Sequence, residues 1–115
     1  DEVDYNILIE SVMMKKARGL SMSFLSPWAT RRFRLQRDGL LKYYLVDNFM
    51  KNTPREKGSF DIIGATVSVK EQEDADDRQY AFEVRFKDKS LYPLLICAND
   101  SKEASKWVES IRRVR

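Results

Sequence analysis

The sequence predicts an α+β domain in which seven short strands form a bent barrel or sandwich and one C-terminal helix caps it. Residues 29–36 alternate between apolar and polar side chains, which is the period of a half-buried strand. Residues 104–111 instead carry apolar side chains at helical spacing. The chain has 115 residues, which suits one domain over 1–115. Because it begins with Asp1, we expect a piece of a longer protein.

The expected strands are apolar or alternating runs that turn residues separate. Gly19 and Pro27 mark a loop at 17–28 after the first strand. The sequence Arg37-Asp38-Gly39 is typical of a hairpin turn between the second and third strands. A polar, basic loop follows the third strand at 47–57. The strands are expected at residues 6–16, 29–36, 40–46, 58–63, 66–72, 80–87 and 91–97.

The last segment changes to the pattern of an amphipathic helix. Its apolar side chains recur at i, i+3, i+4 and i+7 and therefore share one face: Ala104, Trp107, Val108 and Ile111. Asp100, followed three residues later by Glu103, resembles a capping box at the helix start. Three basic residues suit the negative end of the helix dipole: Arg112, Arg113 and Arg115.

Composition excludes several classes of enzyme and metal protein. The chain has no histidine, which removes histidine-based triads and histidine-ligated zinc. Its one cysteine, Cys97, permits no internal disulfide and no cysteine-clustered metal site, and it suits a reducing compartment. Four glycines do not build a phosphate-cradling loop, and no run of about 18 apolar residues exists to span a membrane. We expect a cytosolic, non-enzymatic protein without cofactor or metal.

Charge is segregated along the chain. Residues 15–57 contain eleven basic and three acidic residues and carry a net charge of +8, although the whole chain carries only +3. This asymmetry predicts one electropositive face that attracts phosphates. The opposite cluster, residues 71–77, is acidic but lacks the central glycine and terminal glutamate of an EF-hand calcium loop. It is therefore expected to be a solvated connection between strands.

Five segments of the chain carry motifs whose order and spacing are specific together, although no single motif is. They are residues 11–15, 28–35, 38–44, 58–61 and 105–111, and the last includes the tryptophan of the C-terminal helix, Trp107. On these motifs, nearly the whole chain resembles a pleckstrin homology (PH) domain. The resemblance implies a seven-stranded bent barrel with a capping helix, and a phosphoinositide site between the first loops of many members, which are not enzymes. The segments 8–11 and 57–61 are most similar to PH domains of Tec-type kinases.

Strand parity places two basic residues at the open end of this barrel. Lys15 shares a face with the apolar residues of the first strand, and Arg31 shares one with Phe33. They match the first-strand lysine and the last basic position of the family's lipid motif, whereas Ala29 occupies the middle basic position. That departure favours a simpler phosphomonoester, such as phosphatidic acid, over a multiply phosphorylated inositol ring. The residues expected to bind a lipid head group are Lys15, Lys16, Arg18, Arg31, Tyr43, Lys51, Arg55 and Lys57.

The loop after the first strand carries apolar side chains that a solvent-exposed loop ordinarily lacks. Burying one of them in a bilayer contributes roughly 1.5–3 kcal/mol, and tryptophan favours the membrane interface. We therefore expect this loop to insert into a membrane; the alternatives are that Phe24 or Leu25 folds back on the barrel, or that the loop contacts a protein. The residues expected to insert are Leu20, Met22, Phe24, Leu25 and Trp28.

These features together predict a monomeric, peripheral membrane-targeting module on the cytosolic face of a membrane. It would bind anionic phospholipid head groups, phosphatidic acid or a phosphoinositide, and would need a second anchor elsewhere in the longer chain. The alternative is a protein-interaction PH domain with little lipid specificity, which Ala29 favours. The basic isoelectric point near 9.0 also raises nucleic-acid binding. That function is not expected, because Phe33 is predicted to face the core rather than an open surface.

Overall fold

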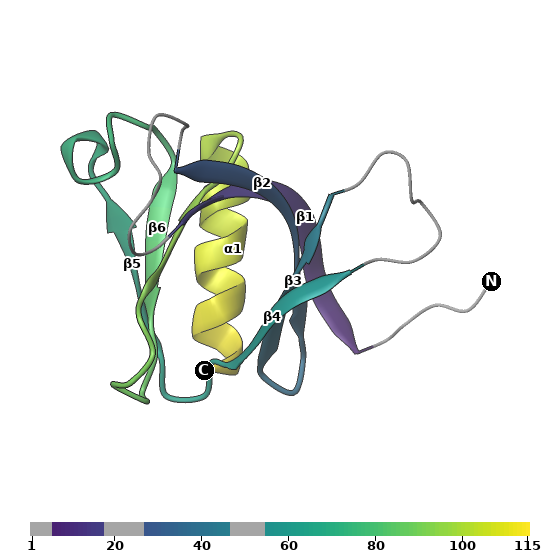
Figure 1. The fold of residues 1–115 in the computed structure, drawn as a ribbon. Coiled ribbons are helices and arrows are strands. Elements are labelled where there is room, and N and C mark those ends of the chain that lie inside the picture. Colours follow the sequence, from purple (N-terminus) through teal and green to yellow (C-terminus); the bar gives the residue numbers. More distant parts are fainter. Residues whose placement is uncertain (1–5, 18–26, 47–54) are drawn as a thin grey trace.

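In the part of the chain that the structure describes, seven strands form one bent antiparallel sheet, and one helix packs along one side of it (Figure 1). The computed structural model describes residues 6–17, 27–46 and 55–115. Its elements in chain order are β1 (Ile7–Lys16), β2 (Trp28–Gln36), β3 (Leu40–Leu45), β4 (Glu56–Asp61), β5 (Thr66–Lys70), the single 3-10 turn η1 (Gln72–Asp74), β6 (Ala81–Arg85), β7 (Leu94–Cys97) and α1 (Ser101–Val114). The α+β class and the seven-stranded, helix-capped architecture expected from the sequence are confirmed.

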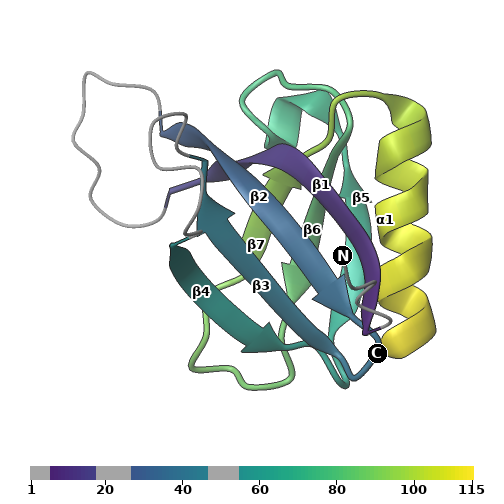
Figure 2. The ribbon, with the colours of Figure 1, turned by 90° about the vertical axis from the view of Figure 1, so that its right-hand side faces the viewer.

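The strand order explains the bend. The strands lie in the order β4-β3-β2-β1-β7-β6-β5, so β1 joins the two halves of the sheet. It pairs with β2 along most of its length, but with β7 only at Met14 and Lys15. The two halves therefore diverge from β1, and α1 lies beside the opening on one side, next to β5 (Figure 2).

The core lies between the two halves of the sheet and α1. Phe33 and Leu35 of β2 are fully buried on the same face, as their alternation predicts. Trp107 from α1 is also fully buried, and its ring meets that of Phe33 edge-on at 6.4 Å between centroids. The indole N–H of Trp107 donates to Ser11 Oγ at 3.0 Å, so its one polar atom is satisfied. The largest fully buried side chain of the described residues, Trp107, therefore comes from this helix.

The helix start confirms the capping signal with one difference. The Asp100 carboxylate accepts from the backbone N–H of Glu103 at 2.8 Å, as an N-cap residue does. The Glu103 carboxylate reaches back to the N–H of Asn99 at 2.7 Å, one residue earlier than in a standard capping box. Among the described residues, no helix has the length and apolar character needed to cross a membrane.

Most strand boundaries differ from the sequence prediction by one to three residues, as at β4, β7 and β2. The fourth strand ends at Asp61 instead of 63, because the Asp61 side chain accepts from Ile63 N–H and turns the chain there. The last strand begins at Leu94 instead of 91, since Pro93 has no N–H to donate to a ladder. The second strand begins one residue earlier than expected, at Trp28, which pairs with Lys16.

Candidate functional site

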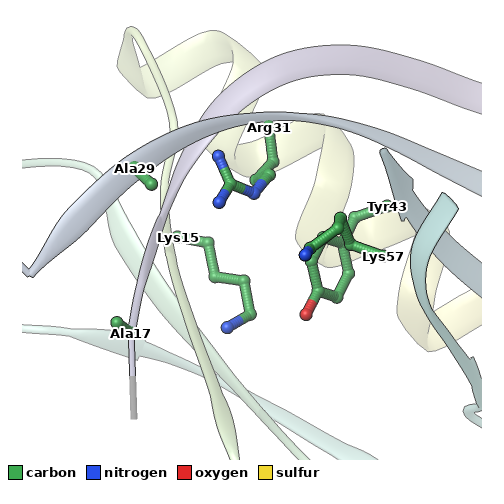
Figure 3. Close-up of a pocket in the computed structure, with 6 residues that line it drawn as sticks. All are labelled: Lys15, Ala17, Ala29, Arg31, Tyr43 and Lys57. Carbon is green, nitrogen blue, oxygen red and sulfur yellow. The ribbon is translucent and has the colours of Figure 1, made fainter. Parts of the chain in front are cut away.

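A small hollow of about 70 Å³ opens where β1 to β4 approach one another at one end of the sheet (Figure 3). Its volume lies well below the range of about 300–1,000 Å³ that is typical of small-molecule pockets. Its lining holds three cationic side chains, one tyrosine and two alanines, and it holds no carboxylate. The lining residues are Lys15, Ala17, Ala29, Arg31, Tyr43 and Lys57.

The pairing of β1 with β2 explains why Lys15 and Arg31 meet. Lys15 lies directly opposite Ala29, and Met13 lies opposite Arg31, so all four side chains share one face of the sheet. Deeper along this face Met13 is buried, whereas Lys15 and Arg31 lie beyond the core at the strand ends. The alternation of side chains along β1 and β2 therefore places two cationic side chains at the open end of a sheet face that is otherwise apolar.

Two of the three cations, Lys15 and Arg31, are oriented by a neighbouring group. The Lys15 ammonium lies 5.2 Å from the centroid of the Tyr43 ring, which is within the range of a cation–π contact. Arg31 donates through Nη1 to its neighbour's carbonyl, Thr30 O, at 2.7 Å. Figure 3 shows the Arg31 guanidinium, the Lys15 ammonium and the Lys57 ammonium directed toward the same space, with the Tyr43 ring at its border.

The position of the Tyr43 ring depends on Gly58, for which the sequence predicted no role in the site. Gly58 of β4 lies directly opposite Tyr43, and a Cβ at this position would overlap Tyr43 Cε1 and lie 3.0 Å from Cζ. The Tyr43 ring stacks on Phe60, with centroids 6.1 Å apart, and Phe60 stacks in turn on Phe86. A glycine inside a strand often marks a place where another group approaches the backbone closely. The position of Gly58 within a predicted strand was therefore the signal that the sequence offered for this contact. Gly58 therefore lets an aromatic stack form the wall of the hollow.

Arg31 and Lys57 differ from the other basic residues of β2 and β3. On the outer face of the sheet, Arg32 and Arg34 both pair with Glu10, and Lys42 pairs with Glu56. Within the described ranges, Arg31 and Lys57 form no ion pair with a carboxylate. Like charges gathered in one place repel each other, and a bound anion relieves that repulsion. The hollow is therefore suited to a phosphate group.

The structure does not bring every predicted head-group residue to this hollow. Lys16 points to the other side of β1, where its ammonium lies 3.0 Å from an Asp76 carboxylate oxygen. Arg55 is exposed, and its carbonyl accepts from Leu45 N–H, but it does not line the hollow. Six predicted residues lie outside the described ranges: Arg18, Leu20, Met22, Phe24, Leu25 and Lys51.

The expectation that Trp28 is exposed in a loop and inserts into a membrane is wrong for this structure. Trp28 begins β2 and is only 6% exposed. Its indole N–H donates to Asp76 at 3.0 Å, and the guanidinium of Arg78 lies 4.9 Å from its ring centroid. Both partners come from the acidic connection at 71–80, which covers Trp28. A buried tryptophan needs an acceptor for its N–H, and this connection supplies one.

Asp76 makes the stability of this cover dependent on pH. Hydrogen bonds, first from Lys16 and then from Trp28, hold the pKa of Asp76 below its ordinary value of 3.8. Because the pKa is lower in the folded chain, the stabilisation is present above the unfolded value and is lost as the pH falls through the folded pKa. We expect Asp76→Asn to lower the free energy of unfolding at pH 7, and to make its decline below pH 3.8 shallower. Urea unfolding across pH 2–7 measures both effects.

The control for this measurement is Asp74→Asn in η1, which removes an exposed aspartate without touching Lys16 or Trp28. The two variants should differ most at neutral pH, and the Asp76→Asn curve should approach that of the unmodified domain in acid. Identical pH profiles for the two variants would contradict a specific role for Asp76.

Comparison with known proteins identifies the family. The family model of the PH domain matches residues 7–115. The chain belongs to the PH domain family. Among the residues of this PH domain that the structure describes, no three side chains of the metal-ligating types are placed to hold an ion. PH domains are generally non-catalytic binding modules, and the hollow contains no nucleophile paired with a base.

Solved structures of other PH domains have the same fold. The C-terminal PH domain of human pleckstrin is 22% identical, with a TM-score of 0.70 over 94% of this chain and 86% of that one. A pleckstrin C-terminal PH domain in complex with D-myo-Ins(1,2,3,4,5)P5 is 21% identical, with a TM-score of 0.67 over 94% and 97%. The PH domain of human oxysterol binding protein-related protein 11 is 24% identical, with a TM-score of 0.66 over 90% and 76%. A comparison with curated proteins finds no significant match.

Proposed function

We propose that this PH domain targets its protein to the cytosolic face of a membrane by binding an anionic phospholipid head group in the hollow between β1 and β4. The observation that carries the proposal is the convergence of Lys15, Arg31 and Lys57 from three strands on one space without a carboxylate. That a neighbouring pleckstrin domain holds an inositol pentakisphosphate supports phosphate as the ligand chemistry.

The arrangement favours a head group with one phosphomonoester. Arg31 offers a planar fork that suits two phosphate oxygens, and a lysine ammonium acts as a point charge. Ala29, directly opposite Lys15, leaves the β2 side of the hollow with one cation where the family motif has two. Lys57 supplies the third charge from β4, on the opposite wall. We therefore place phosphatidic acid and singly phosphorylated phosphoinositides ahead of the more highly phosphorylated ones.

The apolar segment between β1 and β2 provides the second part of the proposal. Ala17 lines the hollow, and its N–H donates to Pro27 O at 2.7 Å, so the described residues that flank this segment meet beside the site. A head group bound there would bring the bilayer to the segment that contains Phe24 and Leu25. Each inserted side chain contributes about 1.5–3 kcal/mol, and each nearby basic residue about 1 kcal/mol on an anionic surface. Together they give weak, reversible attachment.

Liposome co-sedimentation tests the proposal. The panel compares neutral vesicles with vesicles of matched surface charge that contain phosphatidylserine, phosphatidic acid, or phosphoinositides with one to three ring phosphates. We expect phosphatidic acid or a monophosphorylated phosphoinositide to exceed phosphatidylserine, and Phe24→Ser with Leu25→Ser to reduce binding to all anionic vesicles. Equal binding to every anionic vesicle would show attraction by surface charge alone. No binding to any vesicle would overturn the lipid function and favour a protein partner.

A further inference from the structure

The side chains that line the hollow between β1 and β4 offer hydrogen-bond donors and few acceptors (Figure 3). A lysine ammonium has three N–H donors and an arginine guanidinium has five, and neither group can accept. Lys15, Arg31 and Lys57 therefore contribute donors only. Among the lining side chains that the structure describes, the Tyr43 hydroxyl alone can also accept. A ligand that matches this lining must itself supply the acceptors.

The carboxylates that could accept a proton from a ligand belong to other parts of the surface. Glu10, Glu56 and Asp76 each form an ion pair with a basic side chain that does not line the hollow. The described lining residues include no carboxylate. A protonated oxygen of a bound phosphate therefore has no carboxylate partner in this site.

A phosphomonoester changes both its charge and its hydrogen bonding near neutral pH, because its second ionisation has a pKa of about 6. The monoanion retains one P–O–H group, which is a donor and needs an acceptor. The dianion has acceptor oxygens only, and its second negative charge strengthens its attraction to the three cations. A phosphodiester has no proton to lose in this range. The lining of the hollow therefore complements the dianion better than either of the other forms.

Among the residues that the structure describes, we expect no side chain to change its charge between pH 5.5 and 7.5. The chain contains no histidine, and aspartate and glutamate side chains ordinarily lose their protons near pH 4. Burial raises the pKa of Cys97 above its ordinary value of 9.0, so this thiol remains protonated. A change in binding over this interval therefore reports the ionisation of the ligand.

We propose that the hollow binds the dianion of a phosphomonoester in preference to the monoanion, so that membrane attachment of the domain weakens as the pH falls. This inference rests on the proposed lipid function and narrows its ligand to a terminal phosphate. Phosphatidic acid and a ring phosphate of a phosphoinositide both carry this group, whereas phosphatidylserine and phosphatidylglycerol carry a phosphodiester. The domain would then respond to pH without a titrating side chain of its own.

Vesicle co-sedimentation at pH 5.5 and 7.5, at one ionic strength, tests the proposal. Vesicles with phosphatidic acid, or with a phosphoinositide that has one ring phosphate, are compared with phosphatidylglycerol vesicles adjusted to the same zeta potential at each pH. The ratio of phosphomonoester to phosphatidylglycerol affinity should rise about fourfold from pH 5.5 to 7.5, because the dianion fraction at a pKa of about 6 rises by that factor. The phosphomonoester with the larger ratio at pH 7.5 identifies its source.

The outcomes separate this inference from the lipid function. An unchanged ratio, with vesicle binding retained, would overturn the preference for the dianion and leave the lipid function standing. No binding to any vesicle would overturn both. An NMR titration with glycerol 3-phosphate gives the same measurement without a bilayer. Its dissociation constant should be about fourfold lower at pH 7.5 than at pH 5.5, and equal values would again overturn the preference.

Two double variants locate the pH response on the domain. Arg31→Gln with Lys57→Gln removes two cations from the hollow and should reduce the change in the affinity ratio to less than twofold. Arg32→Gln with Lys42→Gln removes the same charge from the outer face of the sheet, where both side chains pair with glutamates, and should retain the fourfold change. An equal pH response in the two double variants would overturn the assignment to the hollow.

Discussion

Arg31→Gln is expected to weaken binding to the preferred anionic vesicles by about 10- to 150-fold. Hydrogen bonds to a charged group contribute about 1.5–3 kcal/mol each in net terms, and the predicted range is that energy converted to a ratio of dissociation constants. Of the cations that line the hollow, Arg31 is the one whose planar guanidinium matches the oxygens of a phosphate. It extends from the same face of the sheet as Met13, its partner on β1. Co-sedimentation at fixed ionic strength, across a range of lipid concentrations, measures the change.

The matched control is Arg32→Gln, the next residue along β2. It removes the same charge, but from the outer face of the sheet, where Arg32 Nη1 lies 3.7 Å from Glu10. If Arg32 acts only through the surface field, its loss costs about 1 kcal/mol, or about fivefold. A clear difference between the two variants supports a bound head group in the hollow. Equal losses would show that the domain responds to surface charge without a specific site.

Trp107→Ala is expected to lower the free energy of unfolding by about 3–5 kcal/mol, the range for removing a fully buried large aromatic side chain. Trp107 is fully buried, packs edge-on against Phe33 and donates to Ser11 Oγ. Its removal leaves a cavity between α1 and the sheet and an unpaired hydroxyl. Since small domains are stable by only about 5–15 kcal/mol, this one change removes a large share of the stability. Urea unfolding followed by circular dichroism measures it.

Trp107→Phe serves as the companion variant because it retains an aromatic ring but loses the indole N–H. Trp107→Phe should lower the free energy of unfolding clearly less than Trp107→Ala does. Adding Ser11→Ala to Trp107→Phe should lower it little further, since the hydrogen bond is already gone. A cost below about 1 kcal/mol for Trp107→Ala would contradict the central role of α1 in the core.

Local pattern in the sequence determined the class of fold and the placement of two of the three cations of the candidate site, Lys15 and Arg31. Alternation along residues 29–36 placed Phe33 in the core and Arg31 on the same face, because the two-residue period of a strand is independent of its partners. The helical spacing of Trp107 and Ile111 likewise predicted the buried face of α1. Lys15, Arg31, Tyr43 and Lys57 of the predicted head-group residues do line one hollow.

Only the tertiary structure decided the contacts between segments that are distant in sequence. Trp28 and Asp76 are 48 positions apart, so no local pattern shows that the acidic connection covers the tryptophan and pairs with Lys16. The role of Gly58 likewise depends on its register with Tyr43 across β3 and β4. Which strands lie at the edges of the sheet follows from the sheet order, and the packing of the whole chain places α1 beside the edge strand β5. The physical reason is that side-chain periodicity is set within a strand or helix, whereas strand partners and covering loops are set by packing over the whole chain.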